Sequence, residues 1–200
     1  MKRLKPGLIM RINEIFYSIQ GEGMNAGRPA SFIRLQGCSV GCVWCDTKNS
    51  WDEKLGTEFT VNEIIDQLES DFIIITGGEP AEQNLHELAH ALRQMGKEIA
   101  IETSGTRIIS EKFDWMTVSP KSFKREILPL NLRLADELKF VYTDSSSEPF
   151  IFSCIAKAGK KPVFIQPNGL SKKSTREAIE FCKKHNFRLS LQMHKYVGIQ

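Results

Sequence analysis

The sequence lacks an excess of charge of either sign, a long apolar run, and any repeated or low-complexity segment. Its 200 residues include 27 Lys or Arg and 24 Asp or Glu, a formal net charge of +3. Direct nucleic-acid binding needs a stronger basic surface, and a membrane-spanning helix needs about 20 consecutive apolar residues. We therefore expect neither a nucleic-acid partner nor a membrane partner.

The composition is that of an ordinary globular protein, with 41% hydrophobic and 26% charged residues. A chain of this length fits one domain with a full hydrophobic core, so we expect a single domain over residues 1–200. The segment from Met1 to Pro6 has no apolar core of the kind that signal peptides contain, and we expect a cytoplasmic protein. Residues 1–9 are expected to form a disordered extension, with Met10 as a candidate start.

Cysteines are few, and their odd count of five does not suggest a disulfide framework. Cys154 and Cys182 fall at apolar positions of predicted helices and are expected in the core. The other three, Cys38, Cys42 and Cys45, lie within eight residues of one another. Their loop is rich in glycine and polar residues, so these three are the candidates for chemistry.

Three thiolates on one loop are one ligand too few for a closed metal site. Structural zinc takes four protein ligands, and an ordinary [4Fe–4S] cluster takes four cysteines. The C-x3-C-x2-C spacing therefore indicates a cluster with one iron left open, and it resembles the local signature of radical S-adenosylmethionine (SAM) enzymes. Two alternatives stay open: a zinc site completed by a distant histidine such as His194, or three unrelated buried thiols.

Short apolar runs alternate with helical patterns, which predicts an α/β fold with a mostly parallel sheet. One helix is expected to begin at Thr60, where Glu63 completes a capping box. Another spans Leu85 to Met95, and a third follows Ser174 and buries Ile179. Because helices are fewer than strands and a full barrel typically needs about 250 residues, we expect a partial, TIM-like β/α barrel. The expected strands are 12–16, 31–36, 72–76, 98–102, 115–118, 138–142, 163–166 and 188–192.

Small and polar residues follow several of these strands. Thr76-Gly77-Gly78-Glu79-Pro80 comes directly after an apolar strand, and its paired glycines permit close backbone approach to a ligand. Alone this segment is an ordinary turn, but in radical SAM enzymes such a turn holds the amino group of SAM. Because strand ends line the ligand crevice of parallel sheets, the segments around Ser104, Ser119 and Asn168 are expected on the same rim.

Upstream of the cysteines, Gln20 and Glu22 lie in a glycine-rich turn and Arg34 lies on a strand. An amide and a carboxylate together match the donor and acceptor pattern of a guanine-like or pterin ring. The Arg34 guanidinium is suited to forked binding of a carboxylate. The alternative is a polar hairpin turn and a solvent-facing arginine.

Together these motifs resemble the 7-carboxy-7-deazaguanine synthase family of radical SAM enzymes. The resemblance covers roughly residues 10–200, with the motifs in family order, and departs from the family at its last residue, a Gln where Pro is common. The motifs are Gln20-Gly21-Glu22-Gly23, Arg34-Leu35-Gln36-Gly37-Cys38, the three cysteines followed by Asp46-Thr47, Thr76 to Pro80, and Leu191-Gln192-Met193-His194-Lys195.

The resemblance implies a radical SAM lyase of 7-deazapurine (queuosine precursor) biosynthesis. Such an enzyme converts 6-carboxy-5,6,7,8-tetrahydropterin to 7-carboxy-7-deazaguanine with loss of ammonia, using a [4Fe–4S] cluster, SAM and Mg²⁺. A flavodoxin or ferredoxin would donate the electron, and the family implies a homodimer. The nearest alternative within enzymes is a glycyl-radical-enzyme activase, and a zinc-binding interaction module is the alternative outside them.

The resemblance also implies roles for individual residues. Cys38, Cys42 and Cys45 would bind the cluster, and Thr47 would bind Mg²⁺, although Thr47 could equally cap a turn after Asp46. His194 and the terminal carboxylate of Gln200 are expected to contact the substrate. The SAM-binding residues would be Trp44, Asp46, Gly78, Glu79, Ser104, Ser119, Pro120 and Lys121. The substrate-binding residues would be Ile19, Gln20, Gly21, Glu22, Arg34, Thr76, His194 and Gln200.

Overall fold

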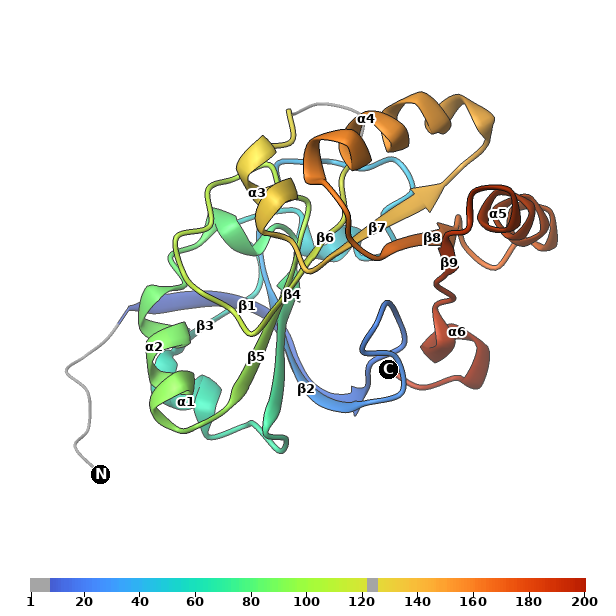
Figure 1. Ribbon diagram of the computed structural model, residues 1–200. Coiled ribbons are helices and arrows are strands. Elements are labelled where there is room, and N and C mark those ends of the chain that lie inside the picture. The colour runs from blue at the N-terminus through green and yellow to red at the C-terminus, as the bar shows by residue number, and fades with distance from the viewer. Residues whose placement is uncertain (1–7, 122–125) are drawn as a thin grey trace. The chain divides into compact units, whose positions relative to one another are not determined.

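The computed structural model describes residues 8–121 and 126–200, which divide into two compact units (Figure 1). The first unit contains the described residues up to Ser18 together with Pro29–Glu102 and Ile109–Trp115. The second contains Ile19–Arg28, Thr103–Ile108 and the described residues of Met116–Gln200. Each unit is an α/β structure that contributes its own strands and helices.

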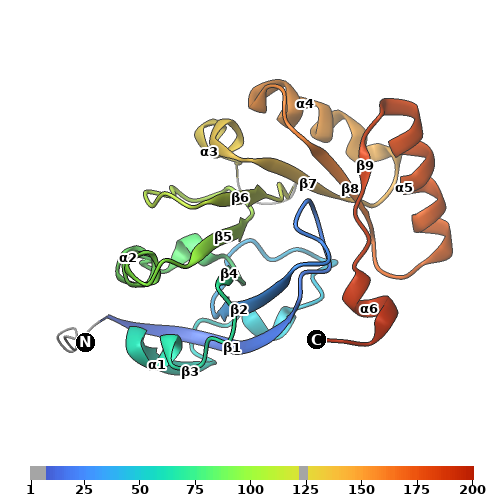
Figure 2. The ribbon, with the colours of Figure 1, turned by 60° about the horizontal axis from the view of Figure 1, so that its bottom comes forward.

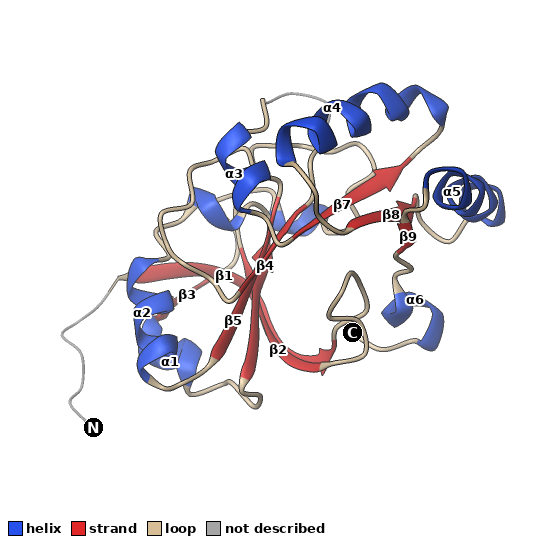
Figure 3. Ribbon diagram, in the orientation of Figure 1, coloured by secondary structure: helices blue, strands red, loops and turns tan. Residues whose placement is uncertain are grey.

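The sheet of the first unit has the strand order β3-β1-β2-β4-β5. β4 pairs in parallel with β2 and β5, and β1 pairs antiparallel with β3. The helical segments, shown blue in Figure 3, are α1, α2 and the short 3-10 turns η1 and η2. The bounds are β1 Ile9–Ile19, β2 Pro29–Leu35, η1 Lys48–Ser50, β3 Thr57–Thr60, α1 Val61–Ile65, β4 Phe72–Gly77, η2 Pro80–Glu82, α2 His86–Gln94 and β5 Glu98–Thr103.

The continuous apolar run Phe72–Ile75 lies in β4, an interior strand of this unit, and all four residues are buried. A strand buried on both faces needs apolar residues at every position. The capping box is present as predicted: Thr60 Oγ1 accepts from Glu63 N at 3.3 Å, and Glu63 Oε2 accepts from Thr60 N at 2.7 Å.

The sheet of the second unit has the order β6-β7-β8-β9, with all neighbouring strands parallel. Figure 2 shows α3, α4 and α5 beside these strands and α6 near the C-terminus. Cys154 in α4 and Cys182 in α5 are buried, as predicted. The bounds are β6 Trp115–Val118, α3 Pro129–Leu134, β7 Glu137–Tyr142, η3 Ser145–Ser147, α4 Glu148–Ala158, β8 Val163–Pro167, α5 Lys172–His185, β9 Arg188–Leu189 and α6 Met193–Val197.

Several predicted boundaries were wrong. α5 begins at Lys172 rather than after Ser174, and Ile179, expected in the core, is 36% exposed. The last strand ends at Leu189 rather than at residue 192, and the sequence reading missed β3, α3 and α6. Each of these three elements has only four to six residues, too few for hydrophobic periodicity to identify.

The prediction of a disordered extension over residues 1–9 is wrong at the C-terminal end of that segment. Ile9 and Met10 belong to β1, Met10 is only 1% exposed, and Leu8 N donates to Glu87 Oε2 at 2.9 Å. Residues 1–7 lie outside the described residues. Within residues 8–121 and 126–200, no helix has the length and apolar character needed to cross a membrane.

Candidate active site

The cysteine loop of the first unit runs from the end of β2 to η1. Both of its ends are held by backbone hydrogen bonds, Gly37 N to Ser50 O at 2.8 Å and Cys38 N to Trp51 O at 3.1 Å. Cys42 is buried, Cys38 and Cys45 are half-buried, and none of the three forms a disulfide. The loop therefore places three reduced cysteines between two fixed ends.

The donor set of this loop fits a cluster with one open iron. The two remaining cysteines of the sequence lie in helices of the second unit, so the loop supplies three thiols and no fourth. Gly37 and Gly41 have positive φ angles of 99° and 62°, a conformation that glycine adopts without strain. Burial raises the pKa of Cys38, and metal binding is what deprotonates such a thiol. In the part of the chain that the structure describes, no three His, Cys, Asp or Glu side chains converge as metal ligands, so the fit rests on the number and kind of ligands on the loop and not on a preformed metal site.

The glycine turn after β4 packs directly against the first cysteine. Gly78 N donates to Leu35 O at 3.0 Å, and Glu79 N donates to Gly37 O at 2.9 Å. A Cβ added to Gly78 would lie 2.1 Å from Gly37 O and 2.9 Å from Cys38 Cβ. The structure therefore brings the predicted SAM-binding turn and the predicted cluster loop together, and only glycine fits at the contact.

Arg34 and Thr76 are register partners on β2 and β4. Arg34 Nε donates to Glu14 Oε1 at 2.7 Å, and Thr76 Oγ1 donates to Glu102 Oε2 at 3.4 Å. The guanidinium lies 5.7 Å from the centre of the Phe16 ring. Arg34 is therefore fixed on two sides within the protein itself, by Glu14 and by Phe16. The carboxylate partner Glu14 was not predicted from the sequence.

Thr47 lies between the cysteine loop and η1. Its hydroxyl donates to Asp46 Oδ1 at 3.1 Å, and its carbonyl accepts from Ser50 Oγ at 2.7 Å. Trp44 and Asp46 lie on the same loop. Thr47 is the N-cap residue of η1, but its side chain makes no capping hydrogen bond. Its hydroxyl oxygen keeps acceptor capacity, so a metal role is compatible with this geometry.

In the second unit, three predicted SAM-binding positions lie close to one another. Ser119 N donates to Thr103 O at 2.7 Å, which places the end of β6 beside the segment that contains Ser104. Lys121 Nζ donates to Ser119 Oγ at 2.6 Å, across Pro120. The hydroxyls of Ser104 and Thr106 are 2.9 Å apart. These polar groups are thus gathered at the strand ends, as predicted.

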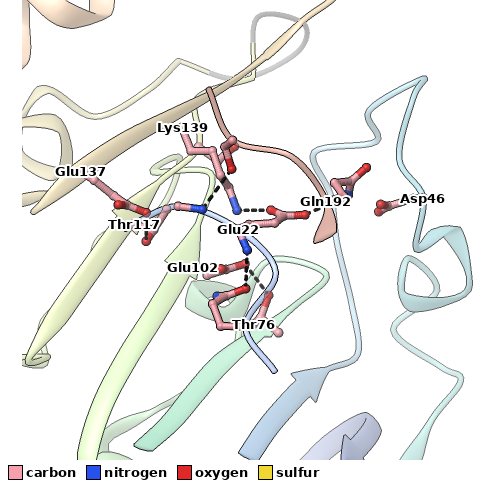
Figure 4. A network of polar contacts seen from close by, with 12 residues as sticks. Glu22, Asp46, Thr76, Glu102, Thr117, Glu137, Lys139 and Gln192 are labelled. Atoms are coloured by element: carbon pink, nitrogen blue, oxygen red, sulfur yellow. Dashed lines mark hydrogen bonds and ion pairs between the residues drawn. The ribbon is translucent and has the colours of Figure 1, made fainter. Parts of the chain in front are cut away.

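The predicted substrate-reading turn lies at the start of the second unit, after Ile19. The backbones of Gln20 and Arg28 fix its base, with Gln20 N donating to Arg28 O at 2.8 Å. Gln20 Oε1 accepts from Glu22 N at 3.1 Å. Figure 4 shows the Glu22 carboxylate between Lys139 and Gln192, with an ion pair to Lys139 and a hydrogen bond of 2.9 Å from Gln192 Nε2.

Lys139 and Glu137 are the functional candidates that the sequence reading missed. Both are buried, at 5% and 2% exposed, and they alternate with apolar residues on β7. Glu137 accepts from Met24 N at 2.8 Å and from Thr117 Oγ1 at 2.9 Å. Two charged residues spaced by two within an apolar strand lie on the same face of the sheet. This spacing was the feature of the sequence that could have identified Glu137 and Lys139 as candidates.

The C-terminal segment packs against the same turn. Met193 N donates to Gly21 O at 3.2 Å, and Ile199 N donates to His194 O at 3.1 Å. A Cβ added to Gly21 would lie 2.5 Å from His194 Nδ1 and 3.1 Å from His194 N. The structure therefore brings the predicted substrate-binding residues Gly21 and His194 into contact.

Replacing Gly21 with alanine should displace His194 and the segment that follows it. If His194 contacts the substrate, the KM for the substrate should rise about tenfold, since small misplacements of binding groups are costly. Steady-state kinetics test this. Gly169→Ala is the control for the general cost of losing a glycine, because Gly169 also lies in the second unit, has a strained φ of +67° and has no atom within 4 Å of the added Cβ. Unchanged KM in Gly21→Ala would contradict a substrate contact by His194.

Comparison with known proteins places the chain in a family. The radical SAM superfamily model matches residues 32–141. The chain is 36% identical to the 7-carboxy-7-deazaguanine synthase of Synechocystis sp., covering 94% of this chain and 93% of that protein. It is also 36% identical to the synthase of Escherichia coli K12, covering 94% and 98%. The crystal structure of QueE from Escherichia coli superimposes with a TM-score of 0.84 at 32% identity, covering 93% and 95%.

The chain is therefore a radical SAM enzyme, with the cysteine loop, glycine turn and α/β fold of that superfamily. Within the superfamily it belongs to the 7-carboxy-7-deazaguanine synthase family. The predicted family, enzyme class and fold class are confirmed. Membership in the superfamily implies a [4Fe–4S] cluster and SAM as cofactors and disfavours the zinc site. Similarity to synthases over nearly the full length disfavours the activase.

Proposed function

We propose that this enzyme acts on 6-carboxy-5,6,7,8-tetrahydropterin and forms 7-carboxy-7-deazaguanine with release of ammonia. The observation that supports this substrate is the turn of Gln20 and Glu22, whose carboxylate is held between Lys139 and Gln192. A fixed carboxylate beside an amide suits the amino-pyrimidine edge that pterins and guanines share. Nearly full-length similarity to synthases of this name supports the same substrate.

In the first unit, Cys38, Cys42 and Cys45 would hold the cluster, and Trp44, Asp46, Gly78 and Glu79 would bind SAM. When bound, the cluster supplies the electron for reductive cleavage of SAM, and this chemistry belongs to the cofactor. The protein positions the reactants and excludes water. Arg34 and Thr76 would bind the substrate, with the Arg34 guanidinium on its carboxylate.

In the second unit, Ser104, Ser119, Pro120 and Lys121 would contribute to SAM binding. Ile19, Gln20, Gly21 and Glu22 would bind the pterin. His194 and the terminal carboxylate of Gln200 would contact the same substrate, and the short helix α6 would position them. Gly21 supports this assignment, because its contact with His194 leaves no room for a side chain.

We further propose that Thr47 binds Mg²⁺ through its hydroxyl. Magnesium takes few protein ligands and keeps oxygens from substrate and water, so one hydroxyl beside the Asp46 carboxylate is a sufficient protein contribution. A flavodoxin or ferredoxin is the proposed electron donor, and a homodimer is the proposed assembly. The reducing environment that a cluster requires makes the cytoplasm the proposed location.

The function is tested by anaerobic turnover of the reconstituted enzyme with SAM, Mg²⁺ and a reductant. We expect 7-carboxy-7-deazaguanine, identified by mass, only when the pterin is present. Formation of 5′-deoxyadenosine without the deazaguanine would keep the radical SAM chemistry and refute the proposed substrate. Omitting Mg²⁺ should lower the rate of product formation without lowering the iron content of the protein.

A further inference from the structure

A buried ion pair joins the turn of residues 20–23 to the sheet of the second unit. The Lys139 ammonium contacts Glu22 Oε2, and the two side chains are 7% and 13% exposed. Lys139 lies on β7 between Leu138 and Phe140, which are 0% and 1% exposed. An ammonium group in the interior therefore faces a carboxylate that lies 117 residues earlier in the sequence.

This pair is a costly way to build a core. Removing two charges from water costs free energy that their mutual attraction only partly returns, and apolar residues of similar size often stabilise a fold as well or better. The neighbouring positions of β7 are already apolar. The charges at positions 22 and 139 therefore point to a role in binding rather than in stability.

The other carboxylate oxygen is held by the C-terminal segment. Gln192 Nε2 donates to Glu22 Oε1 at 2.9 Å, and Lys195 Nζ donates to Gln192 Oε1 at 2.9 Å. A carboxylate can accept about four hydrogen bonds, and the two described here fix its position with acceptor capacity to spare. Glu22 is thus an oriented acceptor.

We propose that Lys139 is a positioning residue that keeps Glu22 ionised and aimed, so that Glu22 can accept the N–H groups of the pterin's amino-pyrimidine edge. This inference rests on the proposed function and deepens it. Lys139 acts through Glu22 and need not touch the substrate. A protonated Glu22 would instead offer a donor where the ring also offers donors, and recognition would be weakened.

The charged groups around Glu22 define what happens when Lys139 is removed. Burial raises the pKa of the Glu22 carboxyl, and the Lys139 charge with the hydrogen bonds from Lys139 and Gln192 brings it below its usual value. From α6, His194 lowers it further, and Lys195 reaches Gln192. From β7, Glu137 is engaged by Thr117 and Met24. Burial raises this pKa, and the Lys139 charge is the main effect that lowers it. Without Lys139 the pKa of Glu22 must therefore rise.

The test is the Lys139→Met variant, which keeps the side-chain length and removes the charge. The ratio of its pterin KM to that of the wild type, measured at each pH, cancels any titration of the substrate. We expect this ratio to be about 10- to 100-fold and to increase as the pH is lowered from about 8 to about 6, because Glu22 becomes protonated.

Lys161→Met is the matched control, because Lys161 donates to the carbonyl oxygens of Arg133 and Ala135 and faces no carboxylate in these bonds. It should lower the melting temperature and leave the pterin KM unchanged. A KM ratio for Lys139→Met that is close to one, or that is independent of pH, would overturn the inference. Failure of the wild type to form deazaguanine would instead refute the proposed function, and the inference with it.

If Lys139→Met does not fold, Lys139→Met combined with Glu22→Gln keeps the inference testable. This pair of changes removes both buried charges at once, which proteins commonly tolerate. We expect a raised pterin KM whose ratio to the wild type does not vary with pH, since the titrating group is gone. A wild-type KM in this double variant would show that neither charge reads the substrate and would overturn the inference.

Discussion

Replacing Cys42 with alanine should abolish deazaguanine formation, lowering it at least about 1,000-fold. The loop supplies three thiols, and the sequence's two remaining cysteines lie in the second unit. Loss of one thiol therefore leaves two ligands on the loop, too few to hold a cubane that already has one open iron. Iron content per protein and the formation of 5′-deoxyadenosine measure this directly, and both should fall to background.

The control for this variant is Cys182→Ala. Cys182 is buried in α5 of the second unit, outside the cysteine loop, and burial raises the pKa of its thiol to about 11. Its loss should cost about 1–2 kcal/mol in the free energy of unfolding through the small cavity left behind. Iron content should remain that of the wild type. Equal loss of iron in both variants would mean that the loop has no special role.

The features that could be predicted from the sequence are those that depend on neighbouring residues. The apolar run Phe72–Ile75 predicts a buried strand, and Thr60 with Glu63 predicts a helix start, because both patterns act over a few residues. The spacing of the three cysteines likewise indicates its chemistry within eight residues. For this reason the sequence places the cysteine loop and the glycine turn directly after strands, and the structure has them after β2 and β4.

The features that could not be predicted depend on residues far apart in the chain. Glu22 and Lys139 are 117 residues apart, and Arg34 and Glu14 are 20 apart on different strands. A charged residue in an apolar strand indicates that a partner of opposite charge is buried nearby, but it does not identify that partner. The start of α5 was predicted wrongly for a different, local reason: Ser174 Oγ accepts from Asn168 N, and Ser171 provides the cap instead.

Replacing Gly78 with alanine should reduce SAM cleavage at least about 100-fold, because the turn and the cluster loop share one contact surface. The added Cβ would lie 2.1 Å from Gly37 O and 2.6 Å from Gly37 C, both backbone atoms. Backbone cannot rotate away as a side chain can, so either the turn or the loop must move. A shift of about 1 Å in a reactant's position can cost 100-fold in rate. The expected result is reduced 5′-deoxyadenosine formation at saturating reductant, with iron bound as in the wild type.

Gly96→Ala separates this close contact from the general cost of losing a glycine. Gly96 follows α2 in the same unit with a φ of 71°, and an added Cβ there meets nothing within 4 Å. Its replacement should cost about 1 kcal/mol of stability through backbone strain and leave SAM cleavage intact. Gly78 has no such φ strain, so a loss of cleavage confined to Gly78→Ala would come from the contact with Gly37 and Cys38. Full cleavage activity in Gly78→Ala would instead mean that the loop and the turn can separate freely, and the SAM-binding role of this turn would then have to be abandoned.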